Sequence, residues 1–534
     1  MSRIPYFSLL LLISLAAGFA LWYATPAGLG LTNDSAAYIG GARSLLAGTG
    51  YSDVWLDSEL EAVTHYPPLL SLTLSGIGLL GLDPYRGARV LHILLFAANT
   101  GLIGLLGFRM TKSQAAGIFL ALLFGTNAQL LRIHAQVLSE PLFLFFSLLS
   151  FLSFHDSLKP DSPKLVTRTS LLVTGFLTGL AFLTRYSGLA LIATFLVAIF
   201  LFQPDWRSRF IRIAQFLAGA VPPIAAWFVR NSLVAESATN RGMQFNLIQI
   251  SNIRTGLWNV ADFLTPFQAW QEWLFRSGAL SAFLIIFALF LLAWLAVNAW
   301  NSLFRSSNHP ITQSPNPITF TTALYVFGYL GAVLFSMSFF DASTKFQHRI
   351  LSPLYVSWMV LLVAIIYRTA KAAKNAKFFN DFFANFAFLA VQSLVVVVLV
   401  LSTFNFQQSL TELREIDGLG YASWRWRQMN VLAIIKDLPP DIAIYSNSPP
   451  AVYLVTGRAS RVIPSRVNPV SGQARSGYEQ SLAEMRAELL AGRAVLALFD
   501  VSDIEDAFGD EIALQFDGLT LLEKSQGNVL YGIP

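Results

Sequence analysis

The sequence predicts a mainly α-helical, multi-pass transmembrane domain followed by a small α/β domain outside the membrane. Hydrophobic residues make up 54% of the 534 residues and charged residues only 13%, against roughly 25% charged residues in soluble domains. A soluble protein of this length could not cover its surface with so few charges. Lipid must therefore surround much of the protein in place of water. Apolar runs recur as far as residue 404, and the mixed polarity of residues 405–534 is typical of a water-soluble domain.

Eleven apolar runs are long enough to cross a bilayer, which takes about 20 residues each. They cover residues 5–24, 89–108, 114–131, 136–155, 170–185, 187–203, 213–230, 279–300, 319–339, 351–367 and 384–404. The first run is longer than a typical signal-peptide core and lacks a small-x-small exit, so a retained helix is favoured over a cleaved signal. Residues 67–82 are apolar but short and begin with two prolines, which favours an interfacial or re-entrant segment.

The charges in the loops predict the orientation of these spans. With the N-terminus in the cytoplasm, the inner loops hold a large set of basic residues, which are Arg3, Arg109, Lys112, Lys159, Lys164, Arg168, Arg207, Arg209, Arg212, Arg305, Arg368, Lys371, Lys374 and Lys377. The first outer loop, 25–88, has an acidic majority instead, and the second long outer loop is 231–278. This pattern follows the positive-inside rule, and it indicates the orientation of a membrane protein and not a nucleic-acid-binding surface. The expected location is the cell (inner) membrane. An odd number of spans places the C-terminus outside.

Residues 405–534 are expected to form a small extracytoplasmic α/β domain beyond the transmembrane domain 1–404. The expected elements, in order, are a strand at 441–446, a turn at 449–450, a helix ending near 457, a loop at 465–477, a helix at 478–490 and a strand at 494–499. Alternating strands and helices are typical of α/β packing.

Ionisable residues at the edges of apolar runs are costly and therefore mark candidate functional sites. In this topology they gather on the outer side of the membrane, and they are Asp34, His65, Glu140, Arg185, Lys345, His348 and Arg349. The middles of the spans are nearly free of charge, whereas an ion-coupled transporter would hold charged sites near the bilayer midplane. Carboxylates together with cations suit an enzyme that needs a base and a cradle for a phosphate.

Several short motifs resemble those of GT-C-fold glycosyltransferases, and they follow one another in the family's order. They are Asn33-Asp34-Ser35 continuing to Tyr38, His65-Tyr66-Pro67-Pro68-Leu69, Ser139-Glu140-Pro141, Thr184-Arg185 continuing to Gly188, and Arg349 continuing to Pro353. The chain is most similar to bacterial relatives of protein O-mannosyltransferases and of the aminoarabinose transferase that acts on lipid A. A soluble C-terminal domain is also part of that architecture.

This resemblance implies a glycosyltransferase that moves a monosaccharide from polyprenyl phosphate to an acceptor hydroxyl, with inversion. Asp34 would be the general base and Glu140 a second catalytic carboxylate. The residues expected to bind substrate are His65, Tyr66, Arg185, Lys345, His348 and Arg349. The implied partners are a lipid-linked sugar donor, membrane lipids and an unidentified acceptor, with no nucleic acid among them.

The first outer loop departs from the family pattern in two places. Ser35 follows Asp34 where many family members carry a second acidic residue, and Thr64-His65-Tyr66 replaces an acidic residue before the two prolines. No cofactor is established by the sequence, and a divalent metal stays open, with Asp34, His65 and Glu140 as candidate ligands. The chain has no cysteine, which excludes disulfides and thiolate ligands.

Simpler explanations stay open for the same residues. Asp34 is a preferred residue for capping the helix expected to follow it, and Glu140 could pair with Arg132 or His134 at the membrane boundary. Two cations could anchor in lipid headgroups, namely Arg185 and Arg349. The other classes of function are a transporter or flippase of a lipid-linked saccharide and a non-catalytic scaffold whose outer domain binds glycans.

Overall fold

The structure is a computed structural model that describes residues 3–56, 61–157, 164–203, 205–234, 243–304, 316–341, 343–375, 381–467, 475, 477–500, 518–525 and 527–533. The chain forms two compact units. The helical unit comprises Met1–Ala24, Leu91–His134 and Ser139–Glu412, and the mixed unit comprises Thr25–Val90, Ala135–Leu138 and Leu413–Pro534. Most of the expected loop 465–477 and several loop charges lie outside the described residues, namely Lys159, Arg305 and Lys377.

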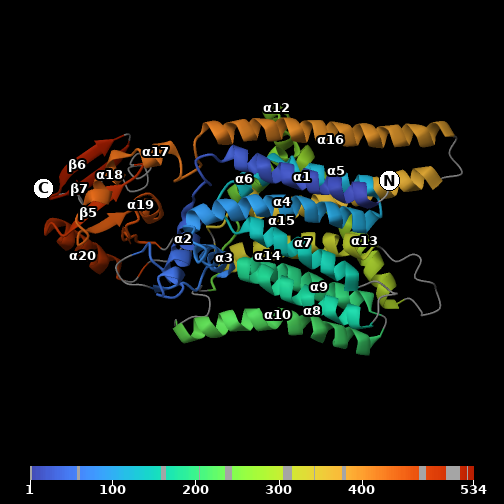
Figure 1. Ribbon diagram of the computed structural model, residues 1–534, viewed down its shortest axis with the longest axis horizontal. Coiled ribbons are helices and arrows are strands. Elements are labelled where there is room, and N and C mark those ends of the chain that lie inside the picture. Colours follow the sequence, from blue (N-terminus) through green and yellow to red (C-terminus); the bar gives the residue numbers. More distant parts are fainter. Residues whose placement is uncertain are drawn as a thin grey trace. The chain divides into compact units, whose positions relative to one another are not determined.

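The helical unit is a bundle of helices of different lengths (Figure 1). They are α1 (Arg3–Ala24), α4 (Pro84–Thr111), α5 (Gln114–Gly125), α6 (Ala128–His134), α7 (Glu140–Ser157), α8 (Lys164–Thr184), α9 (Leu189–Phe202), α10 (Trp206–Val234), α11 (Ile250–Leu264), α12 (Gln268–Arg276), α13 (Ala279–Phe304), α14 (Pro317–Phe339), α15 (His348–Asn375) and α16 (Asp381–Glu415). All eleven predicted apolar runs are helical, although run 136–155 becomes helical only at Glu140.

Seven helices of the described residues are long and apolar enough to cross a membrane, and α5 with α6 makes an eighth if this pair, bent by 60°, is one span. The predicted multi-pass helical fold is confirmed. The number of eleven stays a prediction, because α7 is not among these helices and the described apolar parts of α8 and α9 are shorter, at Thr169–Thr184 and Tyr186–Phe202.

The bend between α5 and α6 follows from helix caps in the predicted span 114–131. Ser113 Oγ accepts the N–H of Ala116 at 3.3 Å and begins α5. Asn127 Oδ1 accepts the N–H of Leu130 at 2.9 Å and begins α6. Because a side-chain cap starts a helix in a new direction, one apolar run becomes two helices.

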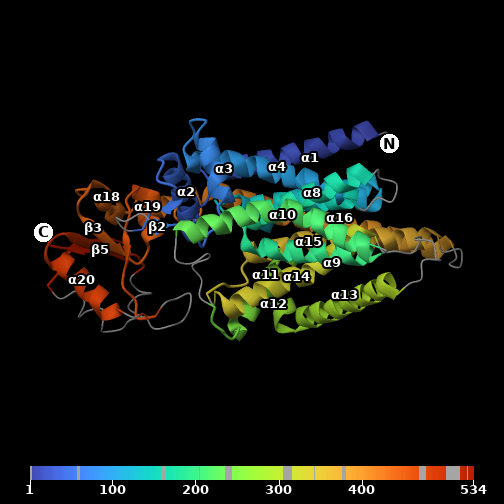
Figure 2. The same ribbon diagram turned by 90° about the horizontal axis from the view of Figure 1, so that it is seen from below.

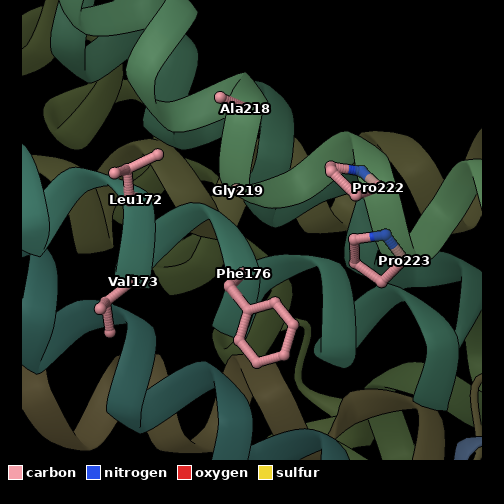
Figure 3. A pocket seen from close by; sticks show the side chains of 7 residues that line it. All are labelled: Leu172, Val173, Phe176, Ala218, Gly219, Pro222 and Pro223. Atoms are coloured by element: carbon pink, nitrogen blue, oxygen red, sulfur yellow. The ribbon is translucent and has the colours of Figure 1, made fainter.

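Helices α8 and α10 approach closely because glycines lie at their contact. A Cβ at Gly175 would lie 2.0 Å from the carbonyl oxygen of Phe216, and one at Gly219 would lie 2.1 Å from that of Leu172. Small residues allow such backbone contacts between membrane helices. The shallow depression beside the contact (Figure 3) is lined by Leu172, Val173, Phe176, Ala218, Gly219, Pro222 and Pro223. It offers no polar side chain for a sugar or a phosphate.

The mixed unit joins the predicted outer loop 25–88 to the C-terminal residues. From the loop come α2 (Asn33–Leu46), the antiparallel strands β1 (Ser52–Asp53) and β2 (Glu61–Ala62), and α3 (Leu69–Gly78). Arg43 of α2 donates to the Tyr453 hydroxyl at 3.5 Å and to Asp83 Oδ2 at 3.0 Å. The loop and the C-terminal residues therefore pack as one body.

The C-terminal residues form a five-stranded sheet with the strand order β4-β3-β5-β7-β6. Its strands are β3 (Ala443–Ser446), β4 (Arg461–Val462), β5 (Ala494–Leu498), β6 (Thr520–Ser525) and β7 (Asn528–Gly532), and its helices are α17 (Trp424–Arg427), α18 (Asn430–Asp437), α19 (Pro449–Thr456) and α20 (Tyr478–Leu490). Strand β3 pairs in parallel with β4 and β5, whereas β7 is antiparallel to β5 and β6.

Two hydrophobic layers cover the two faces of this sheet. Helices α18 and α19 pack on one face and α20 packs on the other (Figure 2). Alternate residues of β5 point to the two layers, with Val495 on one side and Leu496 on the other, as a strand requires. Pro449 and Pro450 begin α19 instead of forming a separate turn, because proline fits the first turn of a helix.

Candidate active site

Asp34 lies in the first turn of α2, two positions after the helix cap. The cap is Thr32, whose N–H donates to Ser35 Oγ at 2.9 Å, and Ser35 Oγ donates to the carbonyl of Val137 at 2.9 Å. Asp34 is therefore not the cap, contrary to the simpler explanation. Its half-buried carboxylate lies at the positive end of the helix dipole, which stabilises a negative charge.

The Tyr66 hydroxyl donates a hydrogen bond to Asp34 Oδ1 at 2.9 Å. The Tyr66 ring packs edge-on against Tyr38 of α2, with 5.5 Å between ring centroids. The ring of His65 lies beside Tyr66, with 4.4 Å between the centroids. Three of the predicted site residues, Asp34, His65 and Tyr66, are therefore neighbours in the mixed unit.

The segment before α2 pairs with a C-terminal segment more than 380 residues away in the sequence. The Leu31 N–H donates to the carbonyl of Leu419 at 3.0 Å, and the Leu31 carbonyl accepts from the Tyr421 N–H at 3.0 Å. Gly420 has a φ of 58°, and a Cβ there would lie 2.1 Å from the Leu31 carbonyl oxygen. This close approach needs glycine, which has no Cβ.

A second segment pairs with the other side of the same stretch. The Gly30 N–H donates to the Ala135 carbonyl at 2.8 Å, and the Val137 N–H donates to the Gly30 carbonyl at 2.9 Å. The Tyr421 hydroxyl donates to Asn33 Oδ1 at 2.5 Å. The position of Asp34 is thus set by three parts of the chain that are remote in sequence.

Glu140 and Arg185 form a buried ion pair in the helical unit. Arg185 has an extended backbone, with a φ of −151°, and lies between α8 and the 3-10 turn Tyr186–Gly188. Its Nη1 lies 2.6 Å from Glu140 Oε1 and donates to Ser139 Oγ at 3.0 Å. The side chain of Glu140 is 1% exposed and that of Arg185 is 17% exposed. A buried charge of this kind depends on its partner, because water does not reach it.

The two residues that the sequence offered as partners of Glu140, Arg132 and His134, contact other side chains. Arg132 forms an ion pair with Glu412. His134 is fully buried, and its Nε2 lies 3.2 Å from the side-chain nitrogen of Asn99. The pairing of Glu140 with Arg132 or His134 is therefore wrong, because α8 brings Arg185 to the start of α7.

Lys345, His348 and Arg349 lie on one short segment at the start of α15. Lys345 is exposed, and Arg349 Nε donates to Gln347 Oε1 at 3.2 Å. His348 Nε2 lies 3.0 Å from Asp262 Oδ2. His348 Nδ1 lies 3.0 Å from the Tyr355 hydroxyl, which itself donates to a backbone carbonyl of α11. His348 is thus part of a network of side chains within the protein.

Asp262 of α11 is a candidate residue that no motif singled out. Besides His348, its carboxylate accepts from Gln129 Nε2 at 2.6 Å and from Gln271 Nε2 at 3.0 Å. These donors come from α6 and α12, so Asp262 connects three helices to the segment that carries Lys345 and Arg349. The available signal in the sequence was a single carboxylate in the amphipathic stretch Ile250–Leu264.

Asp53 of β1 is a further carboxylate in the predicted outer loop 25–88. Burial raises the pKa of Asp53 from 3.8 to about 6, although a hydrogen bond from the Trp55 side chain lowers it in part. Its side chain therefore changes charge near neutral pH.

The candidate metal ligands do not form a cluster of metal-binding side chains. In the part of the chain that the structure describes, no three histidine, aspartate or glutamate side chains gather in a metal-binding group. Ser35 takes the place of a second carboxylate and bonds to Val137, and Glu140 faces Arg185. This donor set does not fit a divalent metal.

Comparisons with known proteins agree with this architecture. Residues 57–233 match the family model of the dolichyl-phosphate-mannose-protein mannosyltransferases. No curated protein sequence was found to match the chain.

Two solved structures share the fold at low sequence identity. One is the crystal structure of ArnT from Cupriavidus metallidurans bound to undecaprenyl phosphate, with a TM-score of 0.58, 13% identity, and 98% of this chain and 97% of that chain covered. The other is the archaeal oligosaccharyltransferase AglB from Archaeoglobus fulgidus in complex with an inhibitory peptide and a dolichol-phosphate, with a TM-score of 0.53, 11% identity, and 92% and 70% covered. The predicted resemblance is confirmed: the chain has the GT-C fold, and residues 57–233 match the mannosyltransferase family model.

Proposed function

We propose that the protein is a polyprenyl-phosphate-dependent membrane glycosyltransferase that transfers a monosaccharide, a hexose or a pentose, to an acceptor hydroxyl. The observation that carries this proposal is the similarity in fold, over 98% of the chain, to a structure with bound undecaprenyl phosphate. The match of residues 57–233 to a family whose name specifies a lipid-phosphate sugar donor supports the same class of substrate.

In the proposed reaction, Asp34 is the general base. It removes the proton of the acceptor hydroxyl as that oxygen attacks the anomeric carbon, and the bond from this carbon to the donor phosphate breaks with inversion. The hydrogen bond from Tyr66 supports this role because it orients the carboxylate. The position at the N-terminus of α2 supports it as well, because the helix dipole favours a negative charge there.

The leaving group is a polyprenyl phosphate, whose negative charge calls for cations. We assign this role to Arg185 and Arg349, with Lys345 as a further cation on the same segment as Arg349. Arginine is suited to bidentate contact with phosphate. Glu140 holds Arg185 through the ion pair, and His65, Tyr66 and His348 complete the set of proposed substrate-binding residues.

The proposed site lies on the outer side of the cell (inner) membrane, with a cytoplasmic N-terminus. In this arrangement residues 1–404 form the transmembrane domain and residues 405–534 the extracytoplasmic domain. The excess of basic residues in the predicted inner loops supports this orientation. A lipid-linked donor fits it, because nucleotide sugars are made inside the cell.

Asp34→Asn tests the proposed base directly. A general base contributes about 10²–10⁴-fold to a rate, so this variant should lose transfer by about that factor while it still binds donor and folds. The measurement is turnover of radiolabelled polyprenyl-phosphate sugars by the purified protein, with the panel of donors identifying the sugar.

The matched control is Asp83→Asn, which removes an aspartate of the same unit that pairs with Arg43 at the surface. This variant should keep wild-type turnover. An Asp34→Asn protein with wild-type turnover would rule out the base, and a wild-type protein that turns over no donor of the panel would rule out the function.

A further inference from the structure

Helices α11 and α12 expose apolar side chains along one side. On α11, Ile250 is 73% exposed, Ile253 is 48% exposed and Leu264 is 47% exposed. On α12, Trp270 is 54% exposed and Trp273 is 62% exposed. These residues recur at intervals of three, four and seven positions or their sums, so they share one side of each helix. We call this the outer face of the pair.

The side of α11 that faces the protein carries hydrogen-bonding groups beside the buried residues Gly256, Val260 and Ala261. Asn252 donates to the Thr344 carbonyl at 2.8 Å and accepts from the Phe346 N–H at 2.9 Å. Asn259, seven residues further along, donates to the Phe346 carbonyl at 2.6 Å. A Cβ at Gly256, between them, would lie 3.0 Å from Phe346. This side of α11 is thus bound closely to the chain before α15.

The inward side of α12 carries a hydrogen-bonding group as well. Gln271 is 8% exposed and donates both to Asp262 Oδ1 at 3.0 Å and to the Thr265 carbonyl at 2.8 Å. The rings of Trp258 and Phe275 pack edge-on with 5.6 Å between centroids and join the two helices. Both helices therefore hold to the protein by hydrogen bonds, and α11 also by buried apolar residues, while both expose large apolar side chains.

A helix on a water-soluble protein buries most of its large apolar side chains, whereas these two helices leave the side chains named above exposed. Exposed apolar side chains gathered on two neighbouring helices mark a surface that another phase or molecule covers. Two exposed tryptophans are typical of the membrane–water interface, where an apolar ring with one polar N–H fits best.

The chain continues from this pair into a helix that needs lipid. After Arg276, the chain enters α13, whose membrane-spanning part Ala279–Leu303 is largely exposed, and Figure 2 shows α12 beside one end of α13. Arg254 of α11 and Arg276 of α12 are both exposed and can reach the phosphates of lipid headgroups from a helix in the interface.

From these observations we infer that α11 and α12 form an interfacial hairpin whose outer face lies in the lipid headgroup region beside α13. The partner is the lipid surface itself. In this arrangement the hydrogen bonds of Asn252, Asn259 and Asp262 tie the membrane boundary to the segment that carries Lys345 and Arg349.

The natural chain contains no cysteine, so single introduced cysteines can be spin-labelled without other changes. Labels at Trp270→Cys, Trp273→Cys and Ile253→Cys report on the outer face, and Gln268→Cys, exposed on another side of α12, is the matched control. The full-length protein is placed in vesicles of phosphatidylethanolamine and phosphatidylglycerol. Collisions of each label with oxygen, which enters lipid, and with a water-soluble nickel chelate are then compared.

The outer-face labels should collide more with oxygen and less with nickel than the control label, as expected for groups about 5–10 Å into the headgroup–acyl boundary. Equal nickel accessibility at the two kinds of position would overturn the inference, because the face would then be in water. Dipolar broadening between outer-face labels of two protein molecules would also overturn it, because a second copy would cover the face.

A second measurement needs no introduced cysteine, so it tests the position of the outer face even if the cysteine variants misfold. Brominated lipids quench tryptophans that lie in the bilayer, so the Trp270→Phe/Trp273→Phe double variant should lose part of the quenching of the wild-type protein. A quenched fraction that is unchanged in this variant would contradict the interfacial position independently of the labels.

Discussion

Replacing Arg185 with glutamine tests whether the ion pair with Glu140 is both buried and coupled. The substitution leaves the Glu140 carboxylate, whose side chain is 1% exposed, without the cation that lies 2.6 Å away. Removing one partner of a buried pair costs about 3–5 kcal/mol, because an uncompensated charge stays in a poorly solvated place. Arg185→Gln should therefore lower the free energy of unfolding by about that amount.

The double variant Glu140→Gln/Arg185→Gln removes both charges and keeps two hydrogen-bonding side chains of similar size. Because no uncompensated charge is left, it should be more stable than Arg185→Gln alone, by about 1–3 kcal/mol. Glu140→Gln alone should fall between the wild type and Arg185→Gln, since Arg185 is 17% exposed and still donates to Ser139.

Unfolding of the detergent-solubilised variants, followed by circular dichroism against denaturant concentration, gives the four free energies of this cycle. The matched control is Arg132→Gln, which breaks the pair with Glu412 in the same unit, where the side chains are 27% and 49% exposed. Such an exposed pair contributes about 0–1 kcal/mol. A double variant as unstable as the sum of the two single variants would refute the coupling of Glu140 and Arg185.

Three further predictions concern the mixed unit. Asp53→Asn should raise the free energy of unfolding by about 3 kcal/mol above pH 6 and change it little below the unperturbed pKa of 3.8. Between pH 3.8 and about pH 6 the folded wild-type protein binds one more proton than the unfolded protein, so its free energy of unfolding falls as the pH rises. Denaturant unfolding of both proteins at several pH values measures this difference. Gly420→Ala should lower both the thermal midpoint and the transfer rate, because its Cβ would meet the Leu31 carbonyl. Tyr66→Phe should lower kcat by about 10- to 100-fold, the size of one hydrogen bond to a charged group, with little change in the thermal midpoint.

Each of these has an outcome that contradicts it. A stability difference between Asp53→Asn and wild type that does not vary with pH would mean that Asp53 is not the titrating group. A Gly420→Ala protein as stable as the wild type would mean that the pairing with Leu31 is loose. An unchanged kcat in Tyr66→Phe would separate this hydroxyl from the reaction.

Local patterns were sufficient for most of the helices. A run such as 319–339 becomes α14 because its own length and apolar character make helix the one way to satisfy every backbone group in lipid. The limits of the helix Tyr478–Leu490 were predicted to the residue, because its pattern is helical and a glycine follows closely. Strands β6 and β7 were not predicted, because their pairing partners are supplied by the fold and their own pattern is weak.

For the candidate site as well, the sequence predicted some features and only the tertiary structure showed others. The sequence by itself determined that the chain is a multi-pass membrane protein with a folded C-terminal part, and that Asp34, Glu140 and Arg185 are unusual residues at the ends of apolar runs. Both conclusions rest on the cost of polar groups in lipid, which can be judged from the order of apolar and ionisable residues along the chain. Only the tertiary structure decided that Arg185 is the partner of Glu140, that Tyr66 orients Asp34, and that Asp262 connects α6, α11 and α12. Hydrogen bonds and ion pairs act over about 3 Å, and the segments that meet at that distance are brought together by the packing of the whole chain.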